Sequence, residues 1–247
     1  MVSQQQQSTD QVSKVVPAEL VSGSHAARTD PAWGLPSHHF SRWPAFIAIC
    51  AAIVLYYVLP ENLIQFKPRQ LFPVLEALLL VPILLTNVRD RWRRTSWKRP
   101  VFMVLIVLVT ASNFTALGLL VFQLTHGHAN NGRELLRAGV DIWVTNIIIF
   151  ALWYWELDRG GPIARLLPNH PEPDFLFPQM TTPEAAPKDW APSFMDYLYV
   201  SFTNSTAFSP TDTMPLTEWA KLLMGAQTLA SLLTIALVGA RAVNILN

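Results

Sequence analysis

Hydroxyl, amide and carboxylate side chains that could handle a small ion are concentrated between Ser193 and Thr217. In channels, such ions are held by carbonyl oxygens, hydroxyl groups and rings of acidic side chains that replace their water shell. The candidate residues for a pore lining are Asn204, Ser205, Thr206, Ala207, Phe208, Ser209 and Asp212. For Asn204, Ser205 and Thr206 there is an alternative, since small polar side chains also bond neighbouring helices in any membrane bundle.

The length of this segment indicates how it meets a membrane. About 14 residues of amphipathic helix extend only about 21 Å, which is short of a hydrocarbon core of about 30 Å. The break at Ser209-Pro210 and the turn around Asp212 are followed by a long apolar helix, Leu216–Val243. Irregular backbone at membrane depth is tolerated only where protein or a water-filled cavity surrounds it. A short helix, a polar turn and a long helix predict a re-entrant pore loop.

Polar residues inside predicted membrane segments form a second group of candidates, because a charge at membrane depth costs several kcal/mol unless it is paired or hydrated. These residues are Glu76, Asn113, Asp141, Asn146 and Asp196. Glu76 has two interpretations, a functional carboxylate or a protonated or snorkelling residue near the interface. Asp196 also has two, a charge favoured by the positive end of a pore helix or a simple N-terminal cap.

The composition places the chain in a membrane. Hydrophobic residues make up 51% of its 247 residues and charged residues only 14%, against about 25% charged in soluble domains. The net charge of +1 implies no general attraction to nucleic acid, and the single Cys50 excludes an intrachain disulfide and a thiolate zinc site. No nucleotide-binding loop, zinc-protease helix or nucleophile elbow is found. We therefore expect no enzyme, no catalytic residues, no metal and no cofactor.

The expected fold class is all-α, a polytopic membrane protein with five transmembrane helices and a short re-entrant half-helix. A polar tail, expected to be disordered, comes first, four helices follow, and a proline-rich linker leads to the half-helix and the fifth helix. The ranges are 1–42 for the tail, 43–59, 71–88, 101–124 and 140–157 for the helices, 158–192 for the linker and 193–247 for the C-terminal unit.

The charge pattern predicts the orientation. Arg89–Arg99 holds six basic residues against one acid between two spans, which marks a cytoplasmic loop by the positive-inside rule. Alternating spans then put the N-terminus and the linker in the cytoplasm of a bacterial cell, with the chain in the inner membrane. A loop between the fourth and fifth helices would enter the bilayer from the cytoplasmic side.

The C-terminal unit, Ser193 to Leu246, resembles the pore loop and inner helix of potassium-channel-like proteins. Either the loop is inverted relative to those proteins, or the basic segment faces outward against the rule, or the dip is only structural; we favour the cytoplasmic assignment of the basic segment. It carries Tyr197-Leu198-Tyr199-Val200-Ser201-Phe202-Thr203 in the place of the pore helix, with Asp212 and Pro215 after it. Ala207-Phe208-Ser209-Pro210 stands where that family has Val-Gly-Tyr-Gly. Phe and Pro cannot adopt the alternating backbone that glycine supplies. The resemblance therefore implies a pore that does not select potassium.

The whole chain is similar to a family of uncharacterised bacterial five-helix membrane proteins, on its helix order, its Arg-rich loop and Asp196-Tyr197-Leu198-Tyr199. This resemblance implies architecture and a bacterial membrane, and it transfers no site residue. Three functions follow as hypotheses: a homo-oligomeric pore for small ions, tetrameric if it is pore-like; a non-conducting scaffold or accessory subunit; and a small transporter coupled through Glu76, Asp141 or Asp196.

Overall fold

The computed structural model is built almost entirely from helices. It describes residues 43–64, 73–78, 98–126, 132–162, 164–166, 172–187, 190–206 and 212–246. Three described helices are long and apolar enough to cross a membrane, at Arg99–Thr125, Gly132–Gly160 and Glu218–Val243, and Trp43–Val58 is a shorter apolar helix. The helical class is thus confirmed, and these helices are consistent with a membrane protein.

The number of five spans is not confirmed. Of the second predicted helix, 71–88, the structure describes only residues 73–78, which are helical. The expected tail 1–42 lies outside the described residues, as does most of the basic loop. The described long elements are α3 (Trp43–Val58), α5 (Lys98–Thr125), α6 (Gly132–Leu157) and α9 (Glu218–Leu246).

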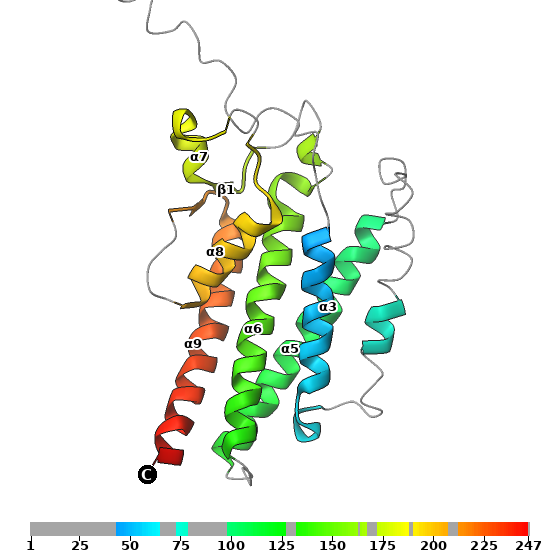
Figure 1. Ribbon diagram of the computed structural model, residues 1–247, viewed down its shortest axis with the longest axis vertical. Coiled ribbons are helices and arrows are strands. Elements are labelled where there is room, and N and C mark those ends of the chain that lie inside the picture. The colour runs from blue at the N-terminus through cyan, green and yellow to red at the C-terminus, as the bar shows by residue number, and fades with distance from the viewer. Residues whose placement is uncertain are drawn as a thin grey trace, which may run out of the picture.

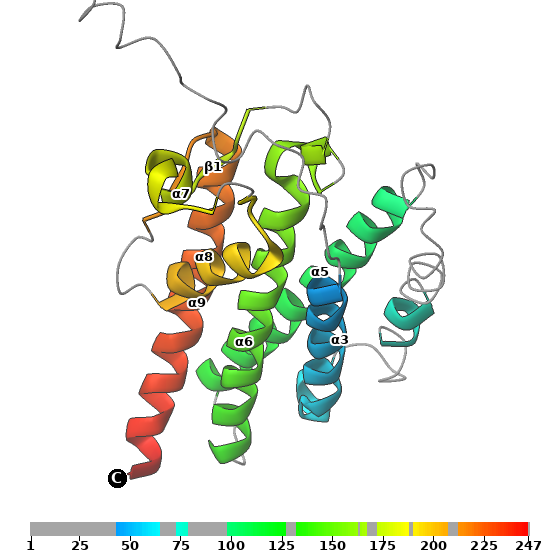
Figure 2. The same ribbon diagram turned by 45° about the horizontal axis from the view of Figure 1, so that its top comes forward.

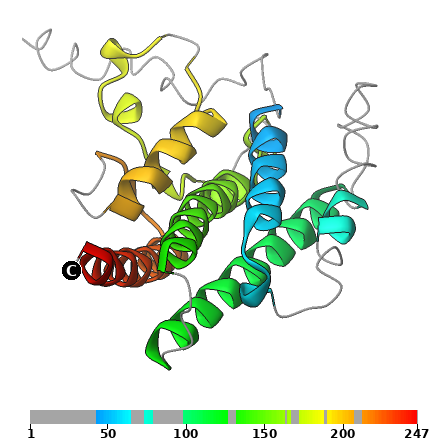
Figure 3. The same cartoon turned by 60° about the horizontal axis from the view of Figure 1, so that its bottom comes forward.

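Helix α6 is the central element. Figure 1, and Figure 3 with the bottom of the molecule turned forward, place α3 and α5 on one side of α6 and α9 on the other. This position explains why α6 is apolar around most of its circumference in its second half, where Ile149, Phe150, Ala151 and Leu152 are all buried. A helix that is hydrophobic all round is one that other helices surround.

Aromatic side chains hold α3, α5 and α6 together near one end of the bundle. Phe46 of α3 packs edge-to-face on Phe102 of α5, with ring centroids 6.3 Å apart. Phe102 packs in turn on Trp155 of α6 at 6.0 Å. Edge-to-face pairs of this kind add roughly 0.5–1.5 kcal/mol to the burial of the rings. At the same end, Arg99 pairs with the buried Glu156, at 3.4 Å between Nε and Oε1.

The half-helix α8 (Phe194–Thr206) has 13 residues and does not cross the bundle. It begins at the end of the molecule where α6 ends and α9 begins, and it descends obliquely between these two helices (Figure 2). The chain then returns to the same end, where β2 (Met214–Pro215) pairs antiparallel with β1 (Phe175–Leu176) before α9 starts. The chain thus leaves one end of the bundle as a short helix and returns to the same end before the last helix.

The boundaries of three helices differ from those expected. α6 begins at Gly132, eight residues before the expected 140, because Leu135 and Ala138 bury one side of this first part while Arg133, Glu134 and Arg137 remain outside. α5 likewise runs from 98 to 125 instead of 101 to 124, and α9 begins at Glu218, two residues after the expected Leu216.

The proline-rich linker is more structured than an extended surface chain. Besides β1 it contains η3 (Asp158–Gly160), η4 (Ala164–Leu166), α7 (Pro178–Thr181) and η5 (Pro183–Ala185). Phe175 and Phe177 are 1% and 3% exposed and pack edge-to-face on Tyr197 of α8. The linker therefore covers the start of the half-helix, and its aromatic side chains complete the hydrophobic core around this short helix.

Candidate functional site

The polar end of α8 is held by a cluster of side chains centred on Gln227 of α9. We call this set the tip cluster: Tyr154, Ser201, Asn204, Ser205, Gln227 and Thr228. The Gln227 Nε2 group donates to the Ser201 carbonyl oxygen at 2.9 Å, to Ser201 Oγ at 2.6 Å and to Ser205 Oγ at 3.2 Å. Its Oε1 accepts hydrogen bonds from Asn204 Nδ2, at 2.9 Å, and from the Tyr154 hydroxyl. Both ends of this amide are thus occupied within the protein.

Asn204 is fully engaged by the same helix. Its Nδ2 also donates to the Met224 carbonyl oxygen at 3.0 Å, and its Oδ1 accepts from Thr228 Oγ1 at 3.1 Å. Ser201 Oγ donates to the Ile147 carbonyl oxygen of α6 at 2.7 Å. The end of the half-helix is therefore bonded to both of the helices between which it lies.

The tip cluster lies in the first half of α9, with Tyr154 three residues before the end of α6. Gln227 is nine residues after Glu218, which at about 1.5 Å per residue is some 13 to 14 Å along α9. A hydrocarbon core is about 30 Å thick. Polar side chains at such a depth need protein partners, and Gln227, Tyr154 and the backbone of α6 provide them.

The four pore-lining candidates that the structure describes are not brought together around one opening. Asn204 and Ser205 face the protein interior, and Ser205 is 1% exposed. Thr206 lines an apolar groove of about 350 Å³ between α6 and α9, with Gly139 and Val238. Ala207, Phe208 and Ser209 lie outside the described residues, and Asp212 is exposed at the end of the molecule.

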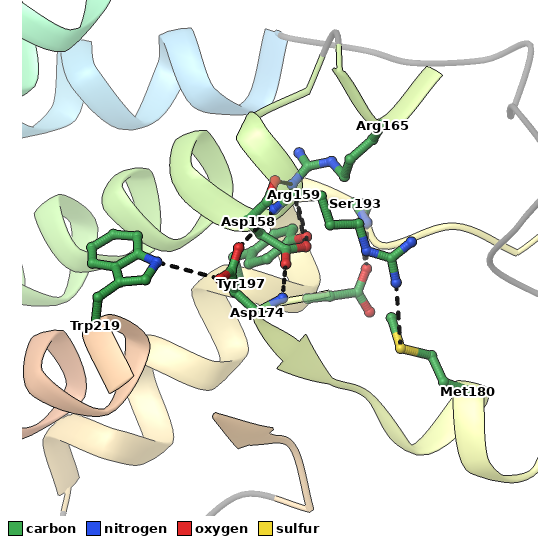
Figure 4. Close-up of polar contacts among 9 residues, drawn as sticks. Asp158, Arg159, Arg165, Asp174, Met180, Ser193, Tyr197 and Trp219 are labelled. Atoms are coloured by element: carbon green, nitrogen blue, oxygen red, sulfur yellow. Dashed lines mark hydrogen bonds and ion pairs between the residues drawn. The ribbon is translucent and has the colours of Figure 1, made fainter. Parts of the chain in front are cut away.

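A second cluster, the end cluster, joins the end of α6, the linker and the start of α8 and α9 (Figure 4). It consists of Asp158, Arg159, Arg165, Asp174, Tyr197, Thr217 and Trp219. Asp158 Oδ2 accepts from the Tyr197 hydroxyl at 2.5 Å and pairs with Arg165 Nη1 at 3.5 Å, while its Oδ1 accepts from the Asp174 backbone N–H at 2.9 Å. Asp158 is 0% exposed, so it depends entirely on these partners.

Asp174 is the linker residue that holds the end cluster together through its carboxylate. Its Oδ1 accepts from Thr217 Oγ1 at 2.8 Å and from Trp219 Nε1 at 3.3 Å, and its Oδ2 accepts from the Arg159 backbone N–H at 2.8 Å. Arg159 adopts a left-handed backbone, with φ 52° and ψ 35°, which is uncommon for a residue with a side chain. The two aspartates therefore fix a strained turn that points the linker back over α8.

Burial affects the titration of this cluster. Tyr197 is fully buried in the first turns of α8, and burial raises its pKa well above the ordinary value, partly offset by the nearby Arg165. The phenol therefore stays protonated at neutral pH and acts as a hydrogen-bond donor to Asp158. The Tyr197 hydroxyl thus donates a hydrogen bond to the buried Asp158–Arg165 ion pair, which is a structural role.

The structure places Asp196 in a capping arrangement. Asp196 is the third residue of α8, and its Oδ2 accepts from the Ser193 backbone N–H and from Ser193 Oγ, both at 2.7 Å. An acidic side chain at the third position that bonds back to the residue before the helix is the arrangement of a capping box. The local contacts thus match the capping interpretation of Asp196.

Two of the polar residues expected inside the membrane share one small cavity. Glu76 and Asn113 line it together with Ser112 and Thr145, and Glu76 is 1% exposed. Glu76 thus lies inside the bundle and does not snorkel to an interface. Asn146 is elsewhere, where its Nδ2 donates to Ser231 Oγ of α9 at 2.9 Å. Asp141 is half-buried, one turn before Thr145 on α6.

The clusters do not present an obvious reaction centre. Glu156, near the end of α6, and Asp158, the first residue of η3, pair with different partners, Arg99 and Arg165. Among the described residues, no three histidine, cysteine, aspartate or glutamate side chains are grouped so that they could hold a metal ion.

Sequence reasoning missed Gln227, whose amide makes five hydrogen bonds within the described residues, and the role of the linker acids. Gln227 is an amide within a long apolar helix, and that signal could have singled it out, because polar groups in such helices require partners. Asp174 carries no comparable signal, since it lies among prolines in a segment that gives no periodic pattern. Comparison of the chain with models of protein families, with curated proteins and with solved structures finds no match.

Proposed function

We propose that this chain is a multi-pass protein of the bacterial inner membrane whose α8, residues 207–212 and α9 form a channel-type loop. Several copies would associate so that these loops surround a path for small ions. The observation that carries the proposal is the course of the chain: α8 ends beside Met224 and Gln227 in the first half of α9, and the chain returns to the end from which it came before α9 begins. Half-helices of this kind occur where a membrane protein needs polar groups at depth.

The path would be lined by residues 207–212 and not by the end of α8. The side chains of Asn204 and Ser205 bond Gln227 and Thr228 of α9 inside the protein, so we assign them to holding the half-helix and not to the path. The segment Ala207-Phe208-Ser209-Pro210 lacks filter glycines, so the path would not select potassium through backbone carbonyls. Asp212, exposed beside β2, would attract cations to its mouth.

A second candidate is a non-conducting scaffold or accessory subunit that keeps the channel-type loop. The observation in its favour is that the polar side chains of the tip cluster bond one another within one protomer: Gln227 bonds Ser201, Asn204 and Ser205. A loop that is satisfied by its own protomer does not need a water-filled axis for stability. The two candidates differ in whether ions cross the membrane.

The orientation belongs to the same proposal. α3 and α9 run away from the end that carries the linker, and α6 runs toward it (Figure 1). Of the six basic residues of Arg89–Arg99, Lys98 and Arg99 begin α5, and Arg99 pairs with Glu156 near the end of α6, on the linker side. By the positive-inside rule this end is cytoplasmic, with the N-terminus, and α8 enters from the cytoplasm.

Purified protein in liposomes provides the test. If the pore proposal holds, a monovalent-cation flux is expected, and Asp212→Asn should reduce it, whereas Glu184→Gln, at an exposed acid of the linker, should not. The oligomeric state in detergent and the labelling of Asp212→Cys, in a Cys50→Ser background because Cys50 is exposed, report symmetry and sidedness. Absence of flux in a folded oligomer at every voltage and pH tested would exclude the pore and leave the scaffold.

A further inference from the structure

A small closed cavity lies in the middle of the bundle, on the side of α6 opposite the tip cluster. It is lined by Ala52, Tyr56 and Leu59 from α3 and the turn after it, by Val109, Ser112, Asn113 and Ala116 from α5, by Thr145 from α6 and by Glu76. Ser112 is fourteen residues after Lys98 and thirteen before Thr125, and Thr145 is thirteen after Gly132 and twelve before Leu157. The cavity is therefore level with the centre of both helices, at the depth of the bilayer midplane.

The polar groups of this cavity are shielded from the surroundings of the protein. The exposed fractions are 1% for Glu76, 5% for Thr145, 6% for Asn113 and 7% for Ser112. About 10 Å³ of the space is open to the centre of a water molecule, which is room for roughly one particle of that size. Such a space admits one water molecule or one small ion, and no organic substrate.

The hydroxyl groups present lone pairs to the cavity and have already used their hydrogens. Ser112 Oγ donates to the Leu108 carbonyl oxygen at 2.9 Å, and Thr145 Oγ1 donates to the Asp141 carbonyl oxygen at 2.7 Å. A hydroxyl has one hydrogen and two acceptor lone pairs, so both oxygens remain as acceptors. Ser112 Oγ also lies near the Glu76 carboxyl group, and its single hydrogen can serve only one of these two acceptors at a time.

The charge balance of the site requires one positive charge. A lone carboxylate in a low-dielectric interior is costly, and among the described residues no lysine, arginine or histidine lines the cavity. One monovalent cation neutralises the single carboxylate, whereas a divalent cation would leave a net charge of +1 in the same surroundings. Carboxylate, hydroxyl and amide oxygens are the hard ligands that such cations prefer.

From these observations we propose that the cavity is a binding site for one small monovalent cation of the size of sodium, held by the Glu76 carboxylate with oxygens of Ser112, Asn113 and Thr145. A bound proton would use one carboxylate oxygen and one acceptor, and it would leave the other lone pairs without a partner. This site is separate from the channel-type loop, so a test of cation binding here does not depend on whether the protein forms a pore.

The test is saturable stabilisation of the full-length protein in detergent at fixed pH and ionic strength, with sodium chloride replacing choline chloride. We expect the melting temperature to rise with sodium concentration, because a ligand that binds only the folded state stabilises it by mass action. Glu76→Gln should abolish the rise, while Glu61→Gln, an exposed glutamate at the end of α3, should keep it.

Thr145→Val provides a variant that keeps the shape of the side chain and removes only the hydroxyl oxygen. Its expected effect is a sodium affinity weaker by roughly tenfold or more, as for other losses near a metal, with a folded protein in choline chloride. Calorimetric titration of sodium into the protein measures the affinity directly. An equal melting temperature in sodium and choline, a sodium effect that survives Glu76→Gln, or a response to pH alone through Glu76 would each overturn the proposal.

Discussion

Asn204 of the half-helix and Gln227 of the last helix form a hydrogen bond of 2.9 Å, nine residues into that last helix. The bond joins the end of an element that does not cross the molecule to one that does. The last polar side chains of the 13-residue α8 end among other helices, where they need partners. Gln227 meets this need from within the same protomer.

Replacing Gln227 by methionine should loosen the half-helix. Methionine keeps the length of the side chain, but it removes the three donated and two accepted hydrogen bonds of the tip cluster. Such bonds average about 0.6 kcal/mol in lipid, and buried groups lose more when they are left unpaired. We expect a loss of about 2–3 kcal/mol in stability, measured as a lower melting temperature in detergent.

The matched control for this prediction is Thr203→Val on the same half-helix. Thr203 Oγ1 donates within α8, to the carbonyl oxygens of Tyr199 and Val200, so its loss should leave the packing of α8 on α9 unchanged. Labelling of a cysteine at Ser205, in the Cys50→Ser background, should accelerate with Gln227→Met and stay slow with Thr203→Val. Equal labelling in both variants would mean that Gln227 does not hold the tip.

Neutralising Asp158 should destabilise the end cluster strongly. Asp158→Asn removes the partner of Arg165 at 3.5 Å and weakens the bond from the Tyr197 hydroxyl, in a place with 0% exposure. Breaking a buried ion pair on one side costs about 3–5 kcal/mol, because the remaining charge stays buried. The expected result is a large fall in the melting temperature. Glu134→Gln, at an exposed position of α6, should change it little.

Alkaline pH should weaken the same cluster through Tyr197. Because burial raises the pKa of Tyr197 above its unfolded value of about 10, its contribution is complete below pH 10 and is lost as pH rises further. The melting temperature of the native protein should therefore fall above about pH 10, and Tyr197→Phe should reduce that slope. A slope identical in the two proteins would place the alkaline sensitivity elsewhere.

The sequence predicted those helices whose presence depends on the length of an apolar run. The runs that became α5, α6 and α9 are long and apolar, and the half-helix is short, polar at its end and followed by Pro210. The linker was less predictable, because Phe175 and Phe177 enter the core through contacts with Tyr197. No local periodicity marks a segment that owes its order to residues twenty positions away.

For the candidate site residues, the sequence likewise predicted one part and not another. The rule that polar groups at membrane depth need partners pointed to Glu76, Asn113 and Asn146, and the structure puts the first two at one cavity and gives the third Ser231 as a partner. It could not say which helix would supply the partner, since that depends on how α6 turns Thr145 toward one neighbour and Asn146 toward the other. Spacing along a sequence fixes faces of a helix, and only packing fixes what those faces meet.

The close approach of α6 and α9 beside the groove at Thr206 gives a last prediction. A Cβ atom added at Gly139 would lie 2.3 Å from Val238 Cγ2, and valine is restricted to few rotamers in a helix. Gly139→Ala should therefore lower the melting temperature, with a cost of about 1–3 kcal/mol for overpacking that exceeds the gain in helix propensity. Gly118→Ala is the control, because a Cβ at Gly118 meets no atom within 4 Å. Adding Val238→Ala to Gly139→Ala should restore most of the loss, since it removes the clashing methyl group. A double variant no more stable than Gly139→Ala alone would show that the two helices are not in contact there.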